Sequence, residues 1–162
     1  MQNNQQGFTL IELVTVIILL GILSAFAISR FPSSQSYSTT IIKNQLLASA
    51  RLAQQTSLSR ASSAENVTLT VSEISGEWHL DVEGGSGITF SAQVERGSEQ
   101  VRFGTNLSAT CSALTAAPFT LTFDGDGNQI PFQSLRICVD SVTDLELCIS
   151  PSGYAYEGSC IP

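Results

Sequence analysis

The chain has 162 residues, 43% of them apolar, and few charges, with seven Lys and Arg against fourteen Asp and Glu. This length suits one domain with its own hydrophobic core. The formal net charge of −7 argues against nucleic-acid binding, because a protein neutralises phosphates with basic side chains. We therefore expect no nucleic-acid partner.

An apolar run dominates the N-terminal part of the sequence. Residues 13–29 carry no charged side chain, and a helix of that length would span roughly 25 Å. Counted from Phe8, the run would span roughly 33 Å, enough to cross a bilayer with Glu12 near one face. The segment differs from a secretory signal, because MQNNQQ contains no Lys or Arg and the small residue Gly7 precedes the apolar run.

The stretch Gly7-Phe8-Thr9-Leu10-Ile11-Glu12-Leu13-Val14 resembles the type III signal of type IV pilins and type II secretion pseudopilins. The resemblance implies cleavage between Gly7 and Phe8 by a prepilin peptidase, which also N-methylates Phe8. It implies a single-pass inner-membrane precursor with its head in the periplasm, followed by an extracellular filament. The implied partners are the peptidase, the membrane and other pilins that pack through the N-terminal helix.

Glu12 is the one charged residue in this segment, and the cost of placing it there calls for an explanation. A carboxylate at the centre of a membrane helix costs about 2.5–3.5 kcal/mol, and less near the interface. The resemblance implies that Glu12 pairs with the terminal amine of a neighbouring subunit. Because such a pair is favourable only when complete, it would check the register of subunit addition. The alternative is a protonated or snorkelling glutamate among the lipid headgroups.

A second helical segment is predicted after Pro32, which should end or kink the first helix. Residues 36–60 have helical periodicity, and their apolar side chains lie near one face. That face comprises Ile41, Ile42, Leu46, Ala50, Ala53 and Leu58. The segment is either the second half of one long helix that docks on a globular head, or a separate surface helix. Both interpretations predict the same buried face.

From Asn66 onward the apolar pattern changes to a period of two, which is typical of strands. We expect strands around Val67–Val71 and at 77–82, 88–94, 101–103, 119–123, 135–139 and 145–149, separated by turns rich in Gly, Ser and Asp. The predicted fold class is α+β, with a long N-terminal helix packed on an antiparallel β-sheet head. The expected organisation is a leader (1–7), a transmembrane and assembly helix (8–31), an amphipathic half (32–62) and a β-rich head (63–162).

The four cysteines lie in the last third of the chain and lack the spacing of metal ligands. They are Cys111, Cys138, Cys148 and Cys160. Behind a membrane-targeting segment, their even number favours disulfides over reduced core thiols. A hairpin with both sets of odd-numbered apolar residues facing the core would favour Cys138–Cys148 and leave Cys111–Cys160. Four cysteines allow three pairings, and the sequence does not decide among them.

The C-terminal region carries a second resemblance. The stretches Leu121–Gly127 and Leu147–Tyr154 resemble the hairpin series of minor pseudopilin H and FimT-type minor pilins. With the terminal cysteines, Arg30-Phe31, Tyr37 and Gln45-Leu46, the sequence looks most like the minor pilins of mannose-sensitive haemagglutinin (MSHA) pili. This implies a minor pilin that initiates or modulates filament assembly and adhesion. DNA-binding FimT-type proteins use basic C-terminal residues, and none follows Arg136 here.

The remaining motifs favour structural roles. Asp124, Asp126 and Asn128 have the 1-3-5 spacing of a calcium loop, but Gln129 and Leu135 stand where its Gly and Glu would be. A turn rich in Gly and Asp explains the same residues. His79 is the only histidine, and its place on a predicted strand indicates ordinary packing. We expect no enzyme activity, no cofactor and no metal site.

Two other functions would be compatible with the same sequence. A minor pseudopilin of a type II secretion system has the same N-terminal signal and the same shape, but serves protein export. A membrane-anchored binding protein without a filament would keep its N-terminus uncut.

Overall fold

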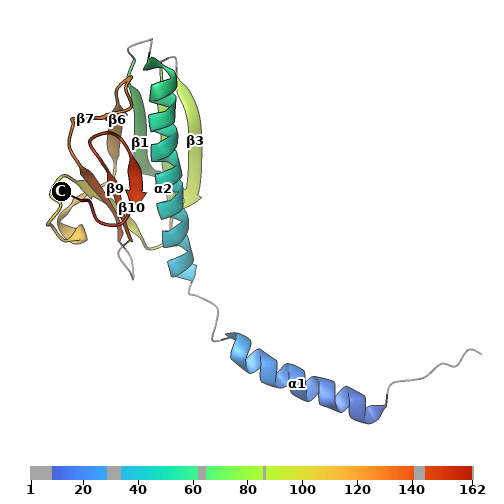
Figure 1. Cartoon of the computed structure of the whole chain (residues 1–162). Coiled ribbons are helices and arrows are strands. Elements are labelled where there is room, and N and C mark those ends of the chain that lie inside the picture. The colour runs from blue at the N-terminus through green and yellow to red at the C-terminus, as the bar shows by residue number, and fades with distance from the viewer. Residues whose placement is uncertain (1–8, 29–33, 62–64, 86, 141–144, 162) are drawn as a thin grey trace, which may run out of the picture. The chain divides into compact units, whose positions relative to one another are not determined.

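The computed structural model describes residues 9–28, 34–61, 65–85, 87–140 and 145–161. The chain divides into two compact units, residues 1–33 and 34–162. The first contains helix α1 (Leu10–Ile28), and the second contains helix α2 (Ser34–Ser59) and the head (Figure 1). The expected boundaries at residues 7, 31 and 62, and the helix break at Pro32, all lie outside the described residues.

The head contains two five-stranded sheets, where the sequence suggested a single one. Sheet A has the strand order β3-β2-β1-β6-β7 and sheet B the order β10-β9-β8-β4-β5, and the neighbouring strands in both are antiparallel. The strands of sheet A are β1 (Val67–Ile74), β2 (Glu77–Gly84), β3 (Ile88–Glu95), β6 (Phe119–Phe123) and β7 (Gln129–Ile130). Those of sheet B are β4 (Gln100–Gly104), β5 (Thr115–Ala116), β8 (Leu135–Asp140), β9 (Leu145–Ile149) and β10 (Ala155–Glu157). The α+β class with an antiparallel head is confirmed.

Strand β1 shows how the period of two builds sheet A. Val67, Leu69 and Val71 are buried, whereas the residues between them are partly exposed. The turn from β1 to β2 consists of Ser75 and Gly76, both with positive φ (55° and 83°). Two such residues form the tight turn whose twist matches that of the flanking strands, and glycine adopts this conformation without steric cost.

Helix α2 buries the predicted face over most of its length. Ile42, Leu46, Ala50 and Ala53 are at most 2% exposed, as the helical periodicity predicts. The prediction was wrong at the two ends of the face. Ile41 is 37% exposed and Leu58 is 50% exposed, because the buried stripe runs through small polar residues at helical spacing instead. These are Thr39, Ser49 and Ser57.

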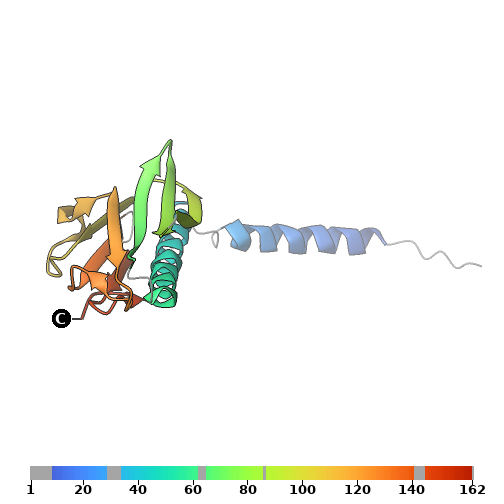
Figure 2. The ribbon, with the colours of Figure 1, turned by 90° about the horizontal axis from the view of Figure 1, so that it is seen from above.

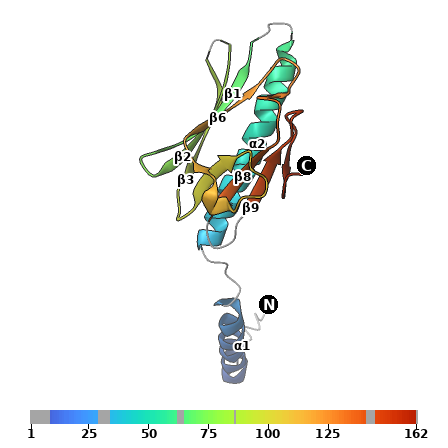
Figure 3. The ribbon, with the colours of Figure 1, turned by 90° about the vertical axis from the view of Figure 1, so that its left-hand side faces the viewer.

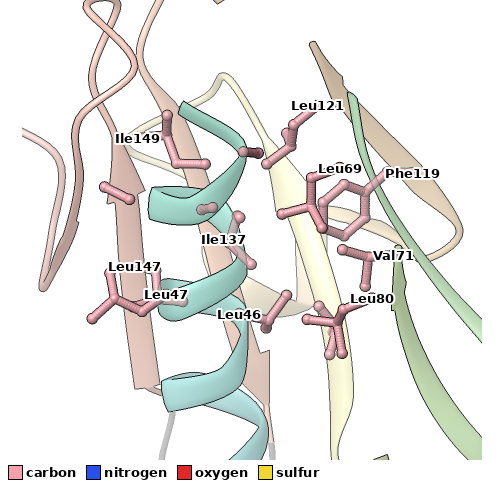
Figure 4. Close-up of a cluster of buried hydrophobic side chains, with 14 of the residues drawn as sticks. Leu46, Leu47, Leu69, Val71, Leu80, Phe119, Leu121, Ile137, Leu147 and Ile149 are labelled. Atoms are coloured by element: carbon pink, nitrogen blue, oxygen red, sulfur yellow. The ribbon is translucent and has the colours of Figure 1, made fainter. Parts of the chain in front are cut away.

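The hydrophobic core lies where α2 meets both sheets. Figure 4 shows Leu46 and Leu47 of α2 between two groups of side chains, Ile137, Leu147 and Ile149 from sheet B and a second group from sheet A. The second group contains Leu69, Val71, Leu80, Phe119 and Leu121. The other views show strands of both sheets running along α2 (Figures 2 and 3). Phe103 of β4 also stacks on Phe119 of β6, with ring centroids 4.4 Å apart, and joins the two sheets.

A matched pair of substitutions on α2 tests this packing. We expect Leu46→Ala to lower the free energy of unfolding of the full chain by about 2–5 kcal/mol, because a buried cavity forms. Leu58→Ala makes the same chemical change on the exposed side and should cost less than about 1 kcal/mol. Denaturant unfolding in detergent, followed by circular dichroism, would measure both. Equal losses would contradict the assigned buried face.

Candidate functional site

The described part of α1 begins with a reciprocal capping arrangement between Thr9 and Glu12. The Thr9 backbone N–H and hydroxyl each lie 3.3 Å from Glu12 Oε2, and the Glu12 backbone N–H donates to Thr9 Oγ1 at 3.3 Å. This is a capping box, in which the first and fourth residues satisfy each other's backbone donors. The carboxylate of Glu12 is therefore held at the helix start by its own chain. The spacing T-x-x-E before an apolar run is a sequence signal for this box.

Between Leu10 and Leu23 the surface of α1 is apolar on every side. Ten large apolar side chains between Leu10 and Leu23 are each more than half exposed. The hydroxyls of Thr15 and Ser24 donate to backbone carbonyls three residues earlier, at 2.9 Å, so they add little polar surface. A helix that is hydrophobic all round is normally buried, either in a protein or in a membrane. A helix of this kind therefore needs a covering surface, of protein or of lipid.

Some expected features of this segment lie outside the described residues. These are the cleavage site between Gly7 and Phe8 and the methylated amine of Phe8, so the pairing of that amine with Glu12 stays a prediction. Among the residues that are described, no helix combines the length and apolar content that crossing a membrane requires.

All four cysteines form disulfides, but the pairing that we favoured from the sequence is wrong. The bonds join Cys111 to Cys138, with Cα atoms 5.7 Å apart, and Cys148 to Cys160, with Cα atoms 5.0 Å apart. In the hairpin of β8 and β9, Cys138 lies opposite Glu146, whereas Cys148 lies opposite Arg136. The register is therefore shifted by two residues from the one that would align Cys138 with Cys148. A shift of two keeps every side chain on its face, so the apolar pattern is the same in both registers.

Arg136 and Glu146 occupy the hairpin positions next to these disulfides. The Arg136 guanidinium forms an ion pair with Glu146, donates to the carbonyl of Ala109, and lies 3.7 Å from Cys111 Sγ. Ser159 donates to the other oxygen of Glu146 at 2.9 Å. The hydrogen bond from Arg136 is the main cause that lowers the pKa of Glu146 below its ordinary value, although burial opposes it. This ion pair thus connects both disulfide-linked segments to one hairpin.

The acidic loop after β6 is a hydrogen-bonded turn. Asp124 Oδ1 accepts the backbone N–H groups of Asp126 (3.0 Å) and Asn128 (2.8 Å), and Oδ2 accepts the Asn128 side-chain amide (3.2 Å). Gly127 has a φ of 79°, which suits glycine in this turn. The Asp124 carboxylate is therefore directed inward at its own turn, the interpretation that we preferred over a calcium loop.

The other metal-ligating side chains do not form a usable centre in the described structure. Cys111, Cys138 and Glu146 lie within reach of one another, but both cysteine sulfurs are consumed by the disulfide. His79 lies on β2, with Nε2 3.9 Å from a carboxylate oxygen of Glu77. We infer no metal centre from these residues.

Comparison with known protein families finds a match in the N-terminal segment. Residues 2–28 match the model of the prokaryotic N-terminal methylation motif. No curated protein matches the chain. Two crystal structures of the type IV minor pilin FimU from Pseudomonas aeruginosa are similar at 18% identity. One has a TM-score of 0.44 and covers 72% of this chain and 90% of FimU, and the other has a TM-score of 0.40 and covers 68% and 90%.

The turn at Asp124 gives a prediction about pH. Burial raises the pKa of Asp124, but the hydrogen bonds from Asn128 and Asp126 outweigh it, so the pKa lies below the ordinary 3.8. A carboxyl group with a lowered pKa stabilises the fold above its unfolded pKa and loses that contribution as the pH falls through its folded pKa. We expect Asp124→Asn to be less stable than wild type at neutral pH. The difference should shrink as the pH falls below 3.8.

Denaturant unfolding at several pH values would measure the effect of Asp124→Asn. Asp126→Asn removes a charge from the same turn but leaves the Asp124 hydrogen bonds in place, so it serves as the matched control. The same loss of stability in both variants at neutral pH would contradict the role assigned to Asp124.

Proposed function

We propose that this chain is a non-enzymatic subunit of a type IV pilin-like filament, made as an inner-membrane precursor with its head in the periplasm. The methylation motif in residues 2–28 supports this role. The observation that carries the proposal is that α1 is apolar on every side from Leu10 to Leu23. A bilayer before assembly and a bundle of like helices after it would each cover that surface.

Glu12 is the residue to which we assign a role in subunit assembly. The carboxylate of Glu12 accepts two hydrogen bonds from Thr9. Its own chain therefore meets part of its need for hydrogen-bond donors. Cleavage after Gly7 would create a positive amine at Phe8 on each subunit. That amine of a neighbouring subunit would offer Glu12 an ion pair in which both partners are charged, whereas Thr9 offers only neutral donors. A misplaced subunit would leave both charges unpaired in apolar surroundings, which is costly.

Within this class we propose a minor pilin of an MSHA-like pilus, similar to the MshC type, that initiates or modulates assembly and adhesion. The basis is the C-terminal pattern from Leu121 to Tyr154 together with the cysteines. The competing functions are a minor pseudopilin for protein export and an anchored binding protein.

The first test concerns the mature N-terminus. Mass spectrometry of the native protein should find a chain that begins at N-methylated Phe8. An uncut Met1 start would contradict the filament proposal and favour the anchored binding protein. Gly7→Val should leave the precursor uncut and provides the control for processing.

The second test separates processing from assembly. Glu12→Val should leave cleavage after Gly7 intact but reduce the amount of this subunit in sheared filaments by at least tenfold, because the carboxylate that selects the amine is gone. Thr15→Val, one turn away, is the control and should assemble normally. Normal incorporation of Glu12→Val would refute the assembly role of this residue.

Deletion of the protein then distinguishes the two filament systems. Loss of surface pili with normal release of exoproteins supports the pilus. Loss of exoprotein release with normal pili would assign the chain to a type II secretion system instead.

A further inference from the structure

The hairpin of β8 and β9 repeats one short pattern, a charged residue two positions before a cysteine. Strand β8 contains Arg136 and Cys138, and strand β9 contains Glu146 and Cys148. Residues two apart on a strand lie on the same face, so each charge shares a face with its cysteine. The side chains of Arg136 and Glu146 are only 10% and 21% exposed. Their ion pair therefore lies largely away from solvent.

Arg136 holds the segment that carries Cys111. Its guanidinium donates to the carbonyls of Leu107 (3.4 Å) and Ala109, and it lies 3.7 Å from Cys111 Sγ. Cys138 follows Arg136 by two residues and forms the disulfide with Cys111. Arg136 thus brings this segment to the side of β8 on which Cys138 lies.

Glu146 holds the segment that carries Cys160 in the same way. The Ser159 hydroxyl donates to Glu146 Oε2 at 2.9 Å, and the Gly158 N–H donates to the Glu146 carbonyl at 2.9 Å. Cys148 follows Glu146 by two residues and forms the disulfide with Cys160. Each charged residue therefore positions the partner of the cysteine that follows it.

The apolar side chains of the hairpin fit two registers equally well. Ile137 lies opposite Leu147 in the observed register, and it would lie opposite Ile149 after a shift of two residues. All three side chains are buried, so their burial does not distinguish the two registers. The choice depends on the other face of the hairpin.

The ion pair can form in the observed register but not in the shifted one. As observed, Cys148 lies opposite Arg136, and Glu146 is a diagonal neighbour that long side chains can reach. A shift of two residues would place Ser150 opposite Arg136. Glu146 would then lie four residues from that position, about 13 Å along the strand at 3.3 Å per residue. This separation is too large for an ion pair.

The register also determines which sulfurs can bond. The shifted register places Cys138 directly opposite Cys148, where Cα atoms are about 4.5–5.5 Å apart and within the range of a disulfide. In the observed register the two cysteines are diagonal neighbours. Diagonal positions are about 7–8 Å apart, which is beyond that range.

We propose that Arg136 and Glu146 select the disulfide pairing of the head, because their ion pair holds β8 and β9 in the register in which Cys138 and Cys148 cannot bond to each other. Cys148 then stays unpaired until Cys160, the last cysteine of the chain, is available. The shifted register leaves both charges without their partner, which is costly at partly buried positions. The inference goes beyond the proposed function, since it concerns the maturation of the head.

Each disulfide forms by two thiol exchanges. A cysteine thiolate of the chain attacks oxidised glutathione and displaces one glutathione thiolate, and the second cysteine thiolate attacks the mixed disulfide and displaces the other. The chain loses two electrons and two protons, and the oxidant becomes two reduced glutathiones. A bond between Cys138 and Cys148 stays open to attack by a further thiolate, so under continued exchange the pairing follows the more stable register.

Disulfide mapping of the full chain tests the inference. The purified protein in detergent would be reduced and unfolded, refolded in a mixture of reduced and oxidised glutathione, quenched with acid and digested between the cysteines. Mass spectrometry would then measure the fraction with a bond between Cys138 and Cys148. We expect Arg136→Leu to raise this fraction at least about tenfold over wild type, because Glu146 is left partly buried without its charged partner.

A milder variant covers the case in which Arg136→Leu does not fold. Glu146→Gln keeps the shape of the side chain and an acceptor for Ser159, and it removes the charge. A neutral acceptor binds the guanidinium more weakly than a carboxylate does, so the same fraction should rise at least about threefold. An unselective mixture of all three pairings in both variants would overturn the inference, because it indicates a lost fold and not a shifted register.

Two controls separate selection from other effects. Arg102→Leu makes the same change on β4, where the guanidinium donates to the carbonyls of Ser112 (3.5 Å) and Leu114 (3.4 Å) beyond Cys111. It leaves the ion pair of the hairpin intact. Leu46→Ala destabilises the head through its core. Both variants should keep the wild-type pairing.

Three other results would contradict the selection of pairing by this ion pair. One is the wild-type pairing in Arg136→Leu. Another is an equal rise in Arg102→Leu, because contacts to the Cys111 segment would then decide the pairing. The third is an equal rise in Leu46→Ala, which would make the pairing a consequence of overall stability.

Discussion

The burial of one stripe of α2 against two sheets is the constraint on which the head depends. The stripe through Ile42, Leu46 and Ala53 is covered by sheet A on one side and sheet B on the other. Both sheets bury apolar side chains in one core with this helix, and a sheet needs such a packed face to be stable. The same packing forms a groove lined by Tyr37, Ile41 and Val94, because α2 and the edge strand β3 are its two walls.

Most of the fold could be predicted from the sequence, and the exceptions have a common physical cause. The seven longer strands were found because their apolar residues recur at every second position of the sequence. Strands β5, β7 and β10 have two or three residues each, too few to show a period. The division into two sheets depends on which strands pair, and the alternation of side chains says nothing about pairing.

The N-terminal signal could be predicted from the sequence, but the disulfide pairing could not. A local pattern predicts roles for Gly7, Phe8 and Glu12, and residues 2–28 match the methylation motif. The disulfide partners depend on the register of β8 and β9, which a two-residue shift changes without moving any apolar side chain off its face. The groove joins residues near positions 40 and 95, so no local pattern could reveal it.

The two disulfides have a consequence for the maturation of the chain. Both are attached to the hairpin of β8 and β9, whereas α2 and the strands of sheet A contain no cysteine. Cys160 follows every strand of the head, so its bond with Cys148 can close only after all strands have reached an oxidising compartment. Under the proposed export route, a polypeptide that stalls before Cys160 emerges could not form this bond. The second disulfide would then mark a head whose translocation is complete.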